Sequence, residues 1–188
     1  MKKILVTGGA GYIGSHAAVE LLDAGYEVVV VDNFYNSKPK AIENIEKITG
    51  KKFKFYEGDV CDKELLRKIF SENEIEAVMH FAGYKAVGES VAKPLMYYRN
   101  NLDCTLSLLE VMEEFNCKKF VFSSSATVYG NPERLPIDEK CRLSVTNPYG
   151  ATKLYIEGIL KDLYISDNEW SIAILRYFNP VGAHESGL

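Results

Sequence analysis

Short apolar runs alternate with segments of helical periodicity along the chain, a pattern typical of β-α-β units and a parallel sheet. The apolar runs predict six strands, at Lys3–Thr7, Glu27–Val31, Phe53–Tyr56, Ala77–Phe81, Phe120–Ser123 and Ser171–Leu175. Helical spacing of apolar residues predicts five helices, at Tyr12–Ala24, Lys40–Thr49, Asp62–Ser71, Pro94–Phe115 and Tyr149–Ile165. This order predicts an α/β fold, a Rossmann-type doubly wound parallel sheet ordered 3-2-1-4-5-6 with helices on both faces.

Composition limits both the number of domains and the class of partner. The 188 residues are 47% hydrophobic, which is enough for one sizeable core, so a single domain over residues 1–188 is expected. The segment Gly130–Asn147 carries two prolines and charges of both signs, which predicts a surface loop. A net charge of -4 argues against nucleic acid or an anionic membrane as the main partner.

The N-terminus and the cysteines bear on the compartment. The apolar run that follows Met1 stops at Thr7, too short for the core of a signal peptide, and no run reaches the ~20 apolar residues of a membrane span. The four cysteines form no C-x-x-C pair, and the three histidines are scattered. We therefore expect a cytoplasmic protein that binds no metal.

Glycines lie where the first predicted strand meets the first predicted helix. Gly8, Gly11 and Gly14 fit a G-x-x-G-x-x-G loop, whose backbone N–H groups and helix N-terminus can face a pyrophosphate. An ordinary β-α turn is the alternative interpretation. Asp32 closes the second strand, where a carboxylate can accept hydrogen bonds from ribose hydroxyls and would repel a 2′-phosphate. This favours NAD over NADP, although an aspartate that only caps a turn is also possible.

Tyr149 and Lys153 form a Y-x-x-x-K pair in the helix predicted before the sixth strand. Residues four apart share a helix face, so the lysine ammonium can hold the phenol and favour its ionised form. A surface Tyr–Lys pair is the alternative. Ser125 follows the fifth predicted strand, at the sheet edge where a dinucleotide would lie, and its hydroxyl can bond a reacting oxygen.

A glycine loop, a serine-bearing strand end and a later Y-x-x-x-K, in this order, resemble the extended short-chain dehydrogenase/reductase superfamily. Three segments are similar to UDP-glucose 4-epimerases: Phe81–Ser90, Ser123–Gly130 and Arg176–His184. Sugar-nucleotide 4,6-dehydratases are the nearest rivals, and they typically carry an Asp-Glu pair after the strand-five hydroxyl. Here the matching positions are Ala126 and Thr127, so the resemblance favours the epimerases.

The resemblance implies that UDP-glucose and UDP-galactose are interconverted by reversible oxidation at C4 with tightly held NAD. It implies Tyr149 as the acid/base, Lys153 as its electrostatic partner and ribose ligand, and Ser125 as the hydroxyl that steadies the 4-oxygen. The implied substrate contacts are Lys85, Ser125, Tyr149 and Asn179. The implied cofactor contacts are Gly8, Gly11, Tyr12, Ile13, Gly14, Asp32, Asn33, Phe34, Tyr35, Asn36, Ser37, Asp59, Val60, Phe81, Ala82, Gly83, Tyr84, Lys85, Asn100, Ser125, Tyr149, Lys153 and Phe178.

The resemblance also implies a homodimer, paired through the helices Pro94–Phe115 and Tyr149–Ile165. Members of the family run to roughly twice the usual single-domain length, with a C-terminal part that holds uridine diphosphate. We therefore expect residues 1–188 to be the NAD-binding Rossmann domain, to lack most of the nucleotide-sugar pocket, and to bind NAD weakly without turnover. Phe178, Pro180 and Val181 are expected to expose an apolar patch. A non-catalytic NAD-binding module and a related dehydratase or reductase remain alternatives.

Overall fold

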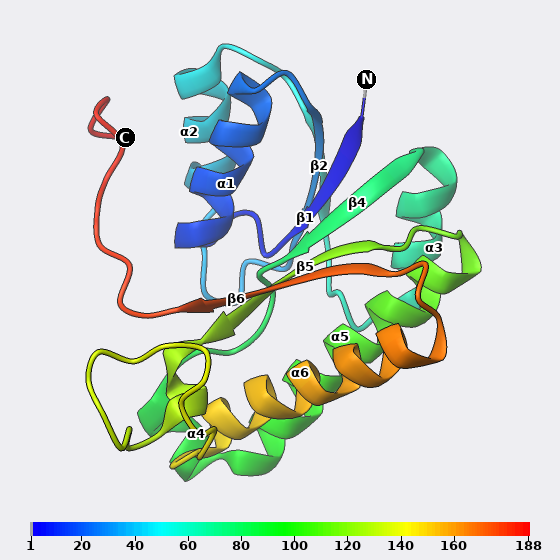
Figure 1. Ribbon diagram of the computed structural model, residues 1–188. Coiled ribbons are helices and arrows are strands. Elements are labelled where there is room, and N and C mark those ends of the chain that lie inside the picture. The colour runs from blue at the N-terminus through cyan, green and yellow to red at the C-terminus, as the bar shows by residue number, and fades with distance from the viewer. Residues whose placement is uncertain (1) are drawn as a thin grey trace.

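The computed structural model describes residues 2–188 and contains a six-stranded sheet (Figure 1). All neighbouring strands pair in parallel, in the order β3-β2-β1-β4-β5-β6. The strands are β1 (Lys3–Thr7), β2 (Glu27–Asp32), β3 (Lys54–Glu57), β4 (Ile75–His80), β5 (Lys119–Ser125) and β6 (Ser171–Tyr177). The predicted doubly wound Rossmann topology is confirmed. Met1, the first residue of the N-terminal segment considered above, lies outside the described residues.

The helices follow the prediction within a few residues, and two short elements were not predicted. The elements are α1 (Tyr12–Asp23), α2 (Lys40–Thr49), α3 (Lys63–Glu72), α4 (Val87–Ala92), α5 (Pro94–Glu114), the 3-10 helix η1 (Ala126–Tyr129) and α6 (Pro148–Ser166). Helix α4 spans six residues and η1 four, so neither is long enough to show a helical period in the sequence. Both lie beside the carboxyl ends of the strands.

Alternate residues of the central strands enter two different cores. Ile4 and Val6 of β1 pack with α1 and α2, whereas Leu5 packs with α3, α5 and α6 on the opposite face. Figure 1 shows the same arrangement, with α1 and α2 on one side of the sheet and α5 and α6 on the other. Strands β1 and β2 are therefore buried on both faces, whereas the edge strand β6 is largely exposed. The carboxyl edge of the sheet is the place where loops can meet a ligand.

The segment 130–147 is mostly exposed, as predicted, but it is anchored. Cys141 is buried with Val128 and Tyr129 of η1, and the Ser144 N–H donates to the carbonyl of Val128 over 2.9 Å. These contacts hold the loop against the carboxyl end of β5. In the described part of the chain, no helix has the length and apolarity that crossing a bilayer requires.

Candidate functional site

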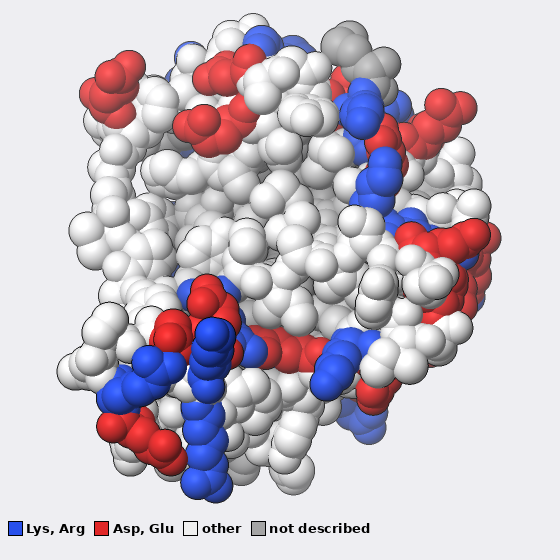
Figure 2. All heavy atoms as spheres, in the orientation of Figure 1, with Lys and Arg blue, Asp and Glu red and all other residues white. Residues whose placement is uncertain are grey.

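A cavity of about 670 Å³ follows the carboxyl edge of the strands. Among the predicted site residues, Phe34 alone does not line it; its ring packs on Phe55 with centroids 5.2 Å apart. On the face in Figure 2, uncharged residues form the centre, and positive and negative side chains are interspersed around it. The predicted residues that line the cavity are Gly8, Gly11, Tyr12, Ile13, Gly14, Asp32, Asn33, Tyr35, Asn36, Ser37, Asp59, Val60, Phe81, Ala82, Gly83, Tyr84, Lys85, Asn100, Ser125, Tyr149, Lys153, Phe178 and Asn179.

The glycines of the loop serve different purposes. Gly8 has a φ of 66°, and a Cβ there would lie 2.7 Å from the backbone N of Ala82. A Cβ at Gly14 would collide with the carbonyl oxygen of Gly8, so this glycine lets α1 start against the loop. Around Gly11 only the Gly8 carbonyl lies within 4 Å of a Cβ, which leaves its outer side open to the cavity.

The N-terminus of α1 is built to receive an anion. No side chain caps the helix, and its first turn contains no acidic residue. The first N–H groups of any helix lack intrahelical acceptors, and the helix dipole places partial positive charge there. Tyr12, Ile13 and Gly14 of this turn line the cavity, so their end of the helix faces it.

Asp32 joins the end of β2 to the glycine loop. Its Oδ2 accepts from the N–H of Ala10 over 3.0 Å, and its Oδ1 accepts from the N–H of Phe34 and the hydroxyl of Ser37. The carboxylate is buried, yet it lines the cavity. Since each carboxylate oxygen accepts about two hydrogen bonds, Oδ2 keeps a free lone pair for a ligand hydroxyl. The two sequence interpretations of Asp32, ligand contact and turn cap, are thus compatible.

Ser125 ends β5 and caps the 3-10 helix that follows. Its Oγ accepts from the backbone N–H of Thr127 over 3.2 Å and from the Thr127 hydroxyl over 3.0 Å. Two lone pairs are therefore occupied, and the remaining capacity of the hydroxyl is to donate its own hydrogen. Thr127 sets this direction and lines the cavity, but it carries no motif that could reveal the role in the sequence.

Tyr149 and Lys153 lie one turn apart on α6 and both line the cavity. Lys153 is buried, and its Nζ donates to the carbonyl of Ser123 over 2.7 Å and lies 5.9 Å from the centroid of the Tyr149 ring. Burial lowers the pKa of Lys153 to about 8. Burial also raises the pKa of Tyr149, and the nearby Ser125 hydroxyl opposes that shift. Burial is the larger of these two effects on the Tyr149 pKa. That Lys153 favours the phenolate stays a prediction.

A buried charge network fixes the end of β5 next to this pair. Glu157, one turn beyond Lys153, accepts from the Ser124 hydroxyl over 2.5 Å and from both Nε and Nη2 of Arg176 on β6. Arg176 also donates to the Tyr129 hydroxyl over 2.8 Å. The network connects α6, β5, β6 and η1, so it holds the strand end that carries Ser125 against the helix that carries Tyr149.

A second network holds the loop after β4. The side-chain amide of Asn101 on α5 accepts from the Tyr84 N–H over 2.8 Å and donates to the Tyr84 carbonyl and to the Thr152 hydroxyl. Gly83 in this loop has a φ of 141°, and its Cβ would lie 3.2 Å from the Asn101 oxygen. Asn101 does not itself line the cavity, and sequence reasoning named only its neighbour Asn100.

Aromatic rings and an acidic residue line the cavity where the loops after β2, β3 and β4 meet. Tyr35 and Tyr84 approach from different loops, with ring centroids 4.6 Å apart. The Asn33 side chain donates to Asp59 Oδ2 over 3.1 Å, which ties the loops after β2 and β3 together. Further lining residues that the sequence did not indicate as ligand contacts are Gly58, Val87, Cys104, Ser123, Ser124, Ala126, Thr127, Gly130, Tyr177 and Pro180.

Known proteins resemble the chain in sequence over almost its whole length. The chain is 64% identical to a UDP-glucose 4-epimerase of Bacillus subtilis over 184 residues, which are 98% of this chain and 54% of the relative. It is 53% identical over 194 residues to a UDP-glucose 4-epimerase of Mus musculus, covering all of this chain and 56% of the relative. The chain thus spans about half the length of these curated relatives.

Solved structures agree with the fold and the sheet order. A UDP-glucose 4-epimerase from Bifidobacterium longum in complex with NAD+ and UDP superposes with a TM-score of 0.98 at 58% identity, over 99% of this chain and 56% of that one. A UDP-glucose-4-epimerase from Stenotrophomonas maltophila with bound NAD gives a TM-score of 0.96 at 46% identity, over 99% and 55%. Residues 4–187 match the NAD dependent epimerase/dehydratase family. The chain, with its glycine loop, Ser125 and Tyr149–Lys153 pair on one sheet edge, therefore belongs to the NAD dependent epimerase/dehydratase family.

Proposed function

We propose that these residues bind NAD and form the catalytic half of a UDP-glucose 4-epimerase. The observation that carries the proposal is one cavity with the open glycine cradle at one wall and Ser125, Tyr149 and Lys153 at another. Its volume of about 670 Å³ lies within the roughly 300–1,000 Å³ of ordinary ligand pockets. Residues 1–188 are proposed to be one NAD-binding domain.

The donors of the cavity fit a dinucleotide. The uncapped turn Tyr12–Gly14 would hold the pyrophosphate, and the free lone pair of Asp32 would accept from the adenosine ribose. Asp59 at the aromatic end would lie near the adenine edge. Lys153 would hold the nicotinamide ribose, within reach of Tyr149. When bound, NAD would supply a reversible hydride acceptor for the sugar C4, so that no net oxidation would result.

Tyr149 is the residue that moves the proton in this proposal. It would take the proton of the sugar 4-hydroxyl and return it to the 4-oxygen when the sugar is reduced again. Ionising an ordinary tyrosine at pH 7 costs about 4 kcal/mol, and burial of Tyr149 adds to this cost. Positive charge must offset it, and the Lys153 ammonium lies 5.9 Å from the centroid of the Tyr149 ring. The Ser125 hydroxyl, whose lone pairs are occupied by Thr127, would donate to the same 4-oxygen in both directions.

The similarity to UDP-glucose 4-epimerases is the reason to choose UDP-glucose and UDP-galactose as substrates. Ala126 and Thr127 stand where 4,6-dehydratases carry their acid pair, which argues against that alternative. A homodimer through α5 and α6 is also proposed. A cytoplasmic location is proposed from the apolar pattern of the sequence and from cysteines that form no C-x-x-C motif. The net charge of -4 argues against nucleic acid and against an anionic membrane as partners.

Two measurements test the proposal. Calorimetric titration with NAD should show binding to the 188-residue chain. For the chemistry, the chain is fused to the C-terminal half of the Bacillus subtilis relative, which supplies the part of the relative that this chain does not span. Product analysis with UDP-galactose and UDP-glucose then follows interconversion.

Tyr149→Phe is the control variant for the fusion. We expect it to keep NAD binding and to lose about 10²–10⁴-fold in interconversion, because only proton transfer is removed. A fusion that is folded and NAD-loaded but inactive with either sugar would favour the non-catalytic binding module. Loss of water from the sugar would favour a dehydratase, and net consumption of NADH a reductase. Rapid conversion by the unfused chain would refute the expectation that these residues bind NAD without turnover.

A further inference from the structure

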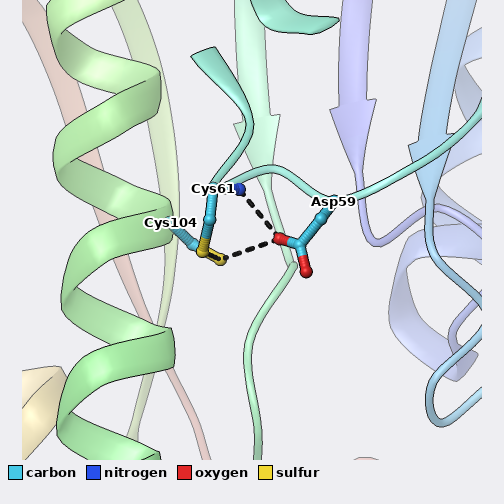
Figure 3. A group of neighbouring side chains, drawn as sticks. All are labelled: Asp59, Cys61 and Cys104. Carbon is cyan, nitrogen blue, oxygen red and sulfur yellow. Dashed lines mark hydrogen bonds between the residues drawn. The ribbon is translucent and has the colours of Figure 1, made fainter.

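Two cysteines meet beside the cavity, at the end proposed for adenine. Cys61 lies in the loop between β3 and α3, and Cys104 lies on α5 (Figure 3). Their sulfur atoms are 2.7 Å apart. Asp59 Oδ1 accepts from the Cys61 N–H over 2.8 Å and from the Cys104 thiol over 3.8 Å. Cys104 lines the cavity together with Asp59, so the pair adjoins the ligand site directly.

The remaining cysteines lie apart from this pair. Cys117 is buried in the core just before β5, and Cys141 lies in the loop after η1, with its thiol beside Asp138. All four cysteines are free thiols. The chain therefore contains one juxtaposed pair and two matched single cysteines, which allows a controlled experiment.

Disulfide chemistry fits the pair better than a metal does. Cys61, Cys104 and Asp59 place their ligand atoms within 4.8 Å of one another. However, two thiolates on a tetrahedral Zn²⁺ with bonds of about 2.3 Å would lie about 3.7 Å apart, so these sulfurs would have to separate. A disulfide bond of about 2.05 Å requires only that sulfurs already in contact close further.

We propose that Cys61 and Cys104 form a reversible thiol–disulfide pair whose oxidation is coupled to dinucleotide occupancy of the cavity. The oxidant is a low-molecular-weight disulfide. The Cys61 thiolate, on the more exposed of the two residues, attacks one sulfur of that disulfide and expels a thiolate. The Cys104 thiolate then attacks Cys61 Sγ and expels the second thiolate. Both cysteine protons pass to the expelled thiolates, so one disulfide is exchanged for another.

The coupling follows from the position of Cys104 and Asp59 on the cavity wall, and it rests on the proposed NAD site. Oxidation removes the Cys104 S–H that points to Asp59 Oδ1, and it joins the Cys61 loop covalently to α5. Asp59, which also accepts from Asn33, would be displaced from its place at the adenine edge. A dinucleotide that needs Asp59 in this place binds the dithiol form more tightly. By linkage, it then favours the dithiol form to the same degree.

The test uses the 188-residue chain in glutathione redox buffers, with free thiols counted after acid quenching and alkylation. We expect the reduced chain to lose two free thiols as the buffer becomes more oxidising. Peptide mapping should then identify a disulfide between Cys61 and Cys104. Saturating NAD should raise the midpoint potential of the couple, because it stabilises the reduced form. A tenfold preference of NAD for the dithiol form corresponds to about 30 mV for this two-electron couple. Calorimetry on the oxidised chain should show the same tenfold loss of NAD affinity.

Single cysteine variants give the controls. Cys117→Ser and Cys141→Ser should form the Cys61–Cys104 disulfide as the wild type does. Cys61→Ser and Cys104→Ser should form no internal disulfide, with folding checked by circular dichroism.

A stable glutathione adduct on the wild type without the internal disulfide would refute the pair. An unchanged midpoint potential, at NAD concentrations that saturate the reduced chain, would refute the coupling. Absence of NAD binding to the reduced chain would refute the proposed NAD site and the coupling. Peptide mapping would still show whether Cys61 and Cys104 form the disulfide.

Discussion

At the scale of single residues, His80 shows how hydrogen bonds and burial keep an imidazole ring neutral. Its Nδ1 lies 2.7 Å from the Thr7 hydroxyl, and its Nε2 lies 3.1 Å from the Thr105 hydroxyl. Thr105 donates its hydrogen to the Asn101 carbonyl, so Nε2 must donate to Thr105 and Nδ1 must accept from Thr7. Both ring nitrogens are then satisfied without a charge. Burial, with a smaller contribution from the Lys153 charge, lowers the pKa of His80 to about 3.

This network predicts a loss of stability in mild acid. The unfolded chain protonates His80 near its ordinary pKa of about 6.5, whereas the folded chain resists protonation down to about 3. The stabilising contribution is therefore complete above pH 6.5 and decreases as the pH falls toward 3, by at most about 1.4 kcal/mol per pH unit. Urea unfolding at a series of pH values measures it.

A histidine outside the core provides the control for this prediction. His80→Asn should flatten the dependence of the unfolding free energy on pH between 6.5 and 4.5. His184→Asn, in the C-terminal segment where the ring bonds Ser186, should leave the dependence unchanged. Equal slopes for wild type and His80→Asn would show that His80 does not govern the acid response.

How far sequence could identify the site depends on whether a residue's partner is local. Tyr149 and Lys153 are one helical turn apart, and the glycine loop is contiguous, so their spacing alone indicated them. Asn101 and Cys104 act through contacts with residues that are distant in the sequence and have no such spacing. The direction of the Tyr149 pKa could not be predicted, because it depends on how deeply the folded chain buries the phenol. Whether the predicted residues bind ligand remains a prediction.

At the scale of elements, the start of α1 tolerates little change, because its backbone packs closely against the glycine loop. Gly14→Ala would push a Cβ into the Gly8 carbonyl and force helix and loop apart. We expect a loss of about 1–3 kcal/mol in the free energy of unfolding, as for other overpacked sites, together with weaker NAD binding. Denaturant unfolding and calorimetric titration measure the two effects.

Gly158 in the middle of α6 is the matched control. Nothing lies within 4 Å of a Cβ there, so Gly158→Ala should gain about 1 kcal/mol of helix stability and keep NAD binding. If both substitutions changed NAD affinity alike, the cradle geometry would not explain the first result. The two variants make the same substitution in a helix and differ only in how closely other atoms surround the added Cβ.

Element prediction succeeded where a periodic pattern was long and failed where it was short. Strand β1 and helix α2 have the predicted bounds, and the sheet order follows from alternating strands and helices with right-handed connections. Helix α4 and η1 are set by contacts instead: Ser125 caps η1, and the Tyr97 hydroxyl accepts from the N–H of Ala86 where α4 begins. Strand β5 runs on to Ser125 because β6 pairs with it to the end.

At the scale of the molecule, two exposed apolar surfaces predict different kinds of association. Leu106 on α5 and Tyr155 on α6 are 40% and 53% exposed on helices that pack together. Phe178 and Val181, after β6, are 56% and 89% exposed, as expected for the apolar patch. The Tyr12 hydroxyl donates to the Gly182 carbonyl over 2.7 Å and holds this segment beside α1. The helices present a regular face, whereas the segment is an extended strip.

We therefore predict a concentration-dependent dimer through the helices, to be measured by sedimentation velocity. A stable dimer buries about 800 Å² on each partner, which two long helices can provide and a short strip cannot. Tyr155→Glu and Leu106→Glu should shift the chain toward monomer, because each would place a charge in an apolar interface. Val181→Glu should leave the dimer intact and reduce only larger species. If only Val181→Glu caused dissociation, the interface would have to lie at the strip and not at the helices. A wild type that is monomeric at every concentration would show that neither surface mediates self-association.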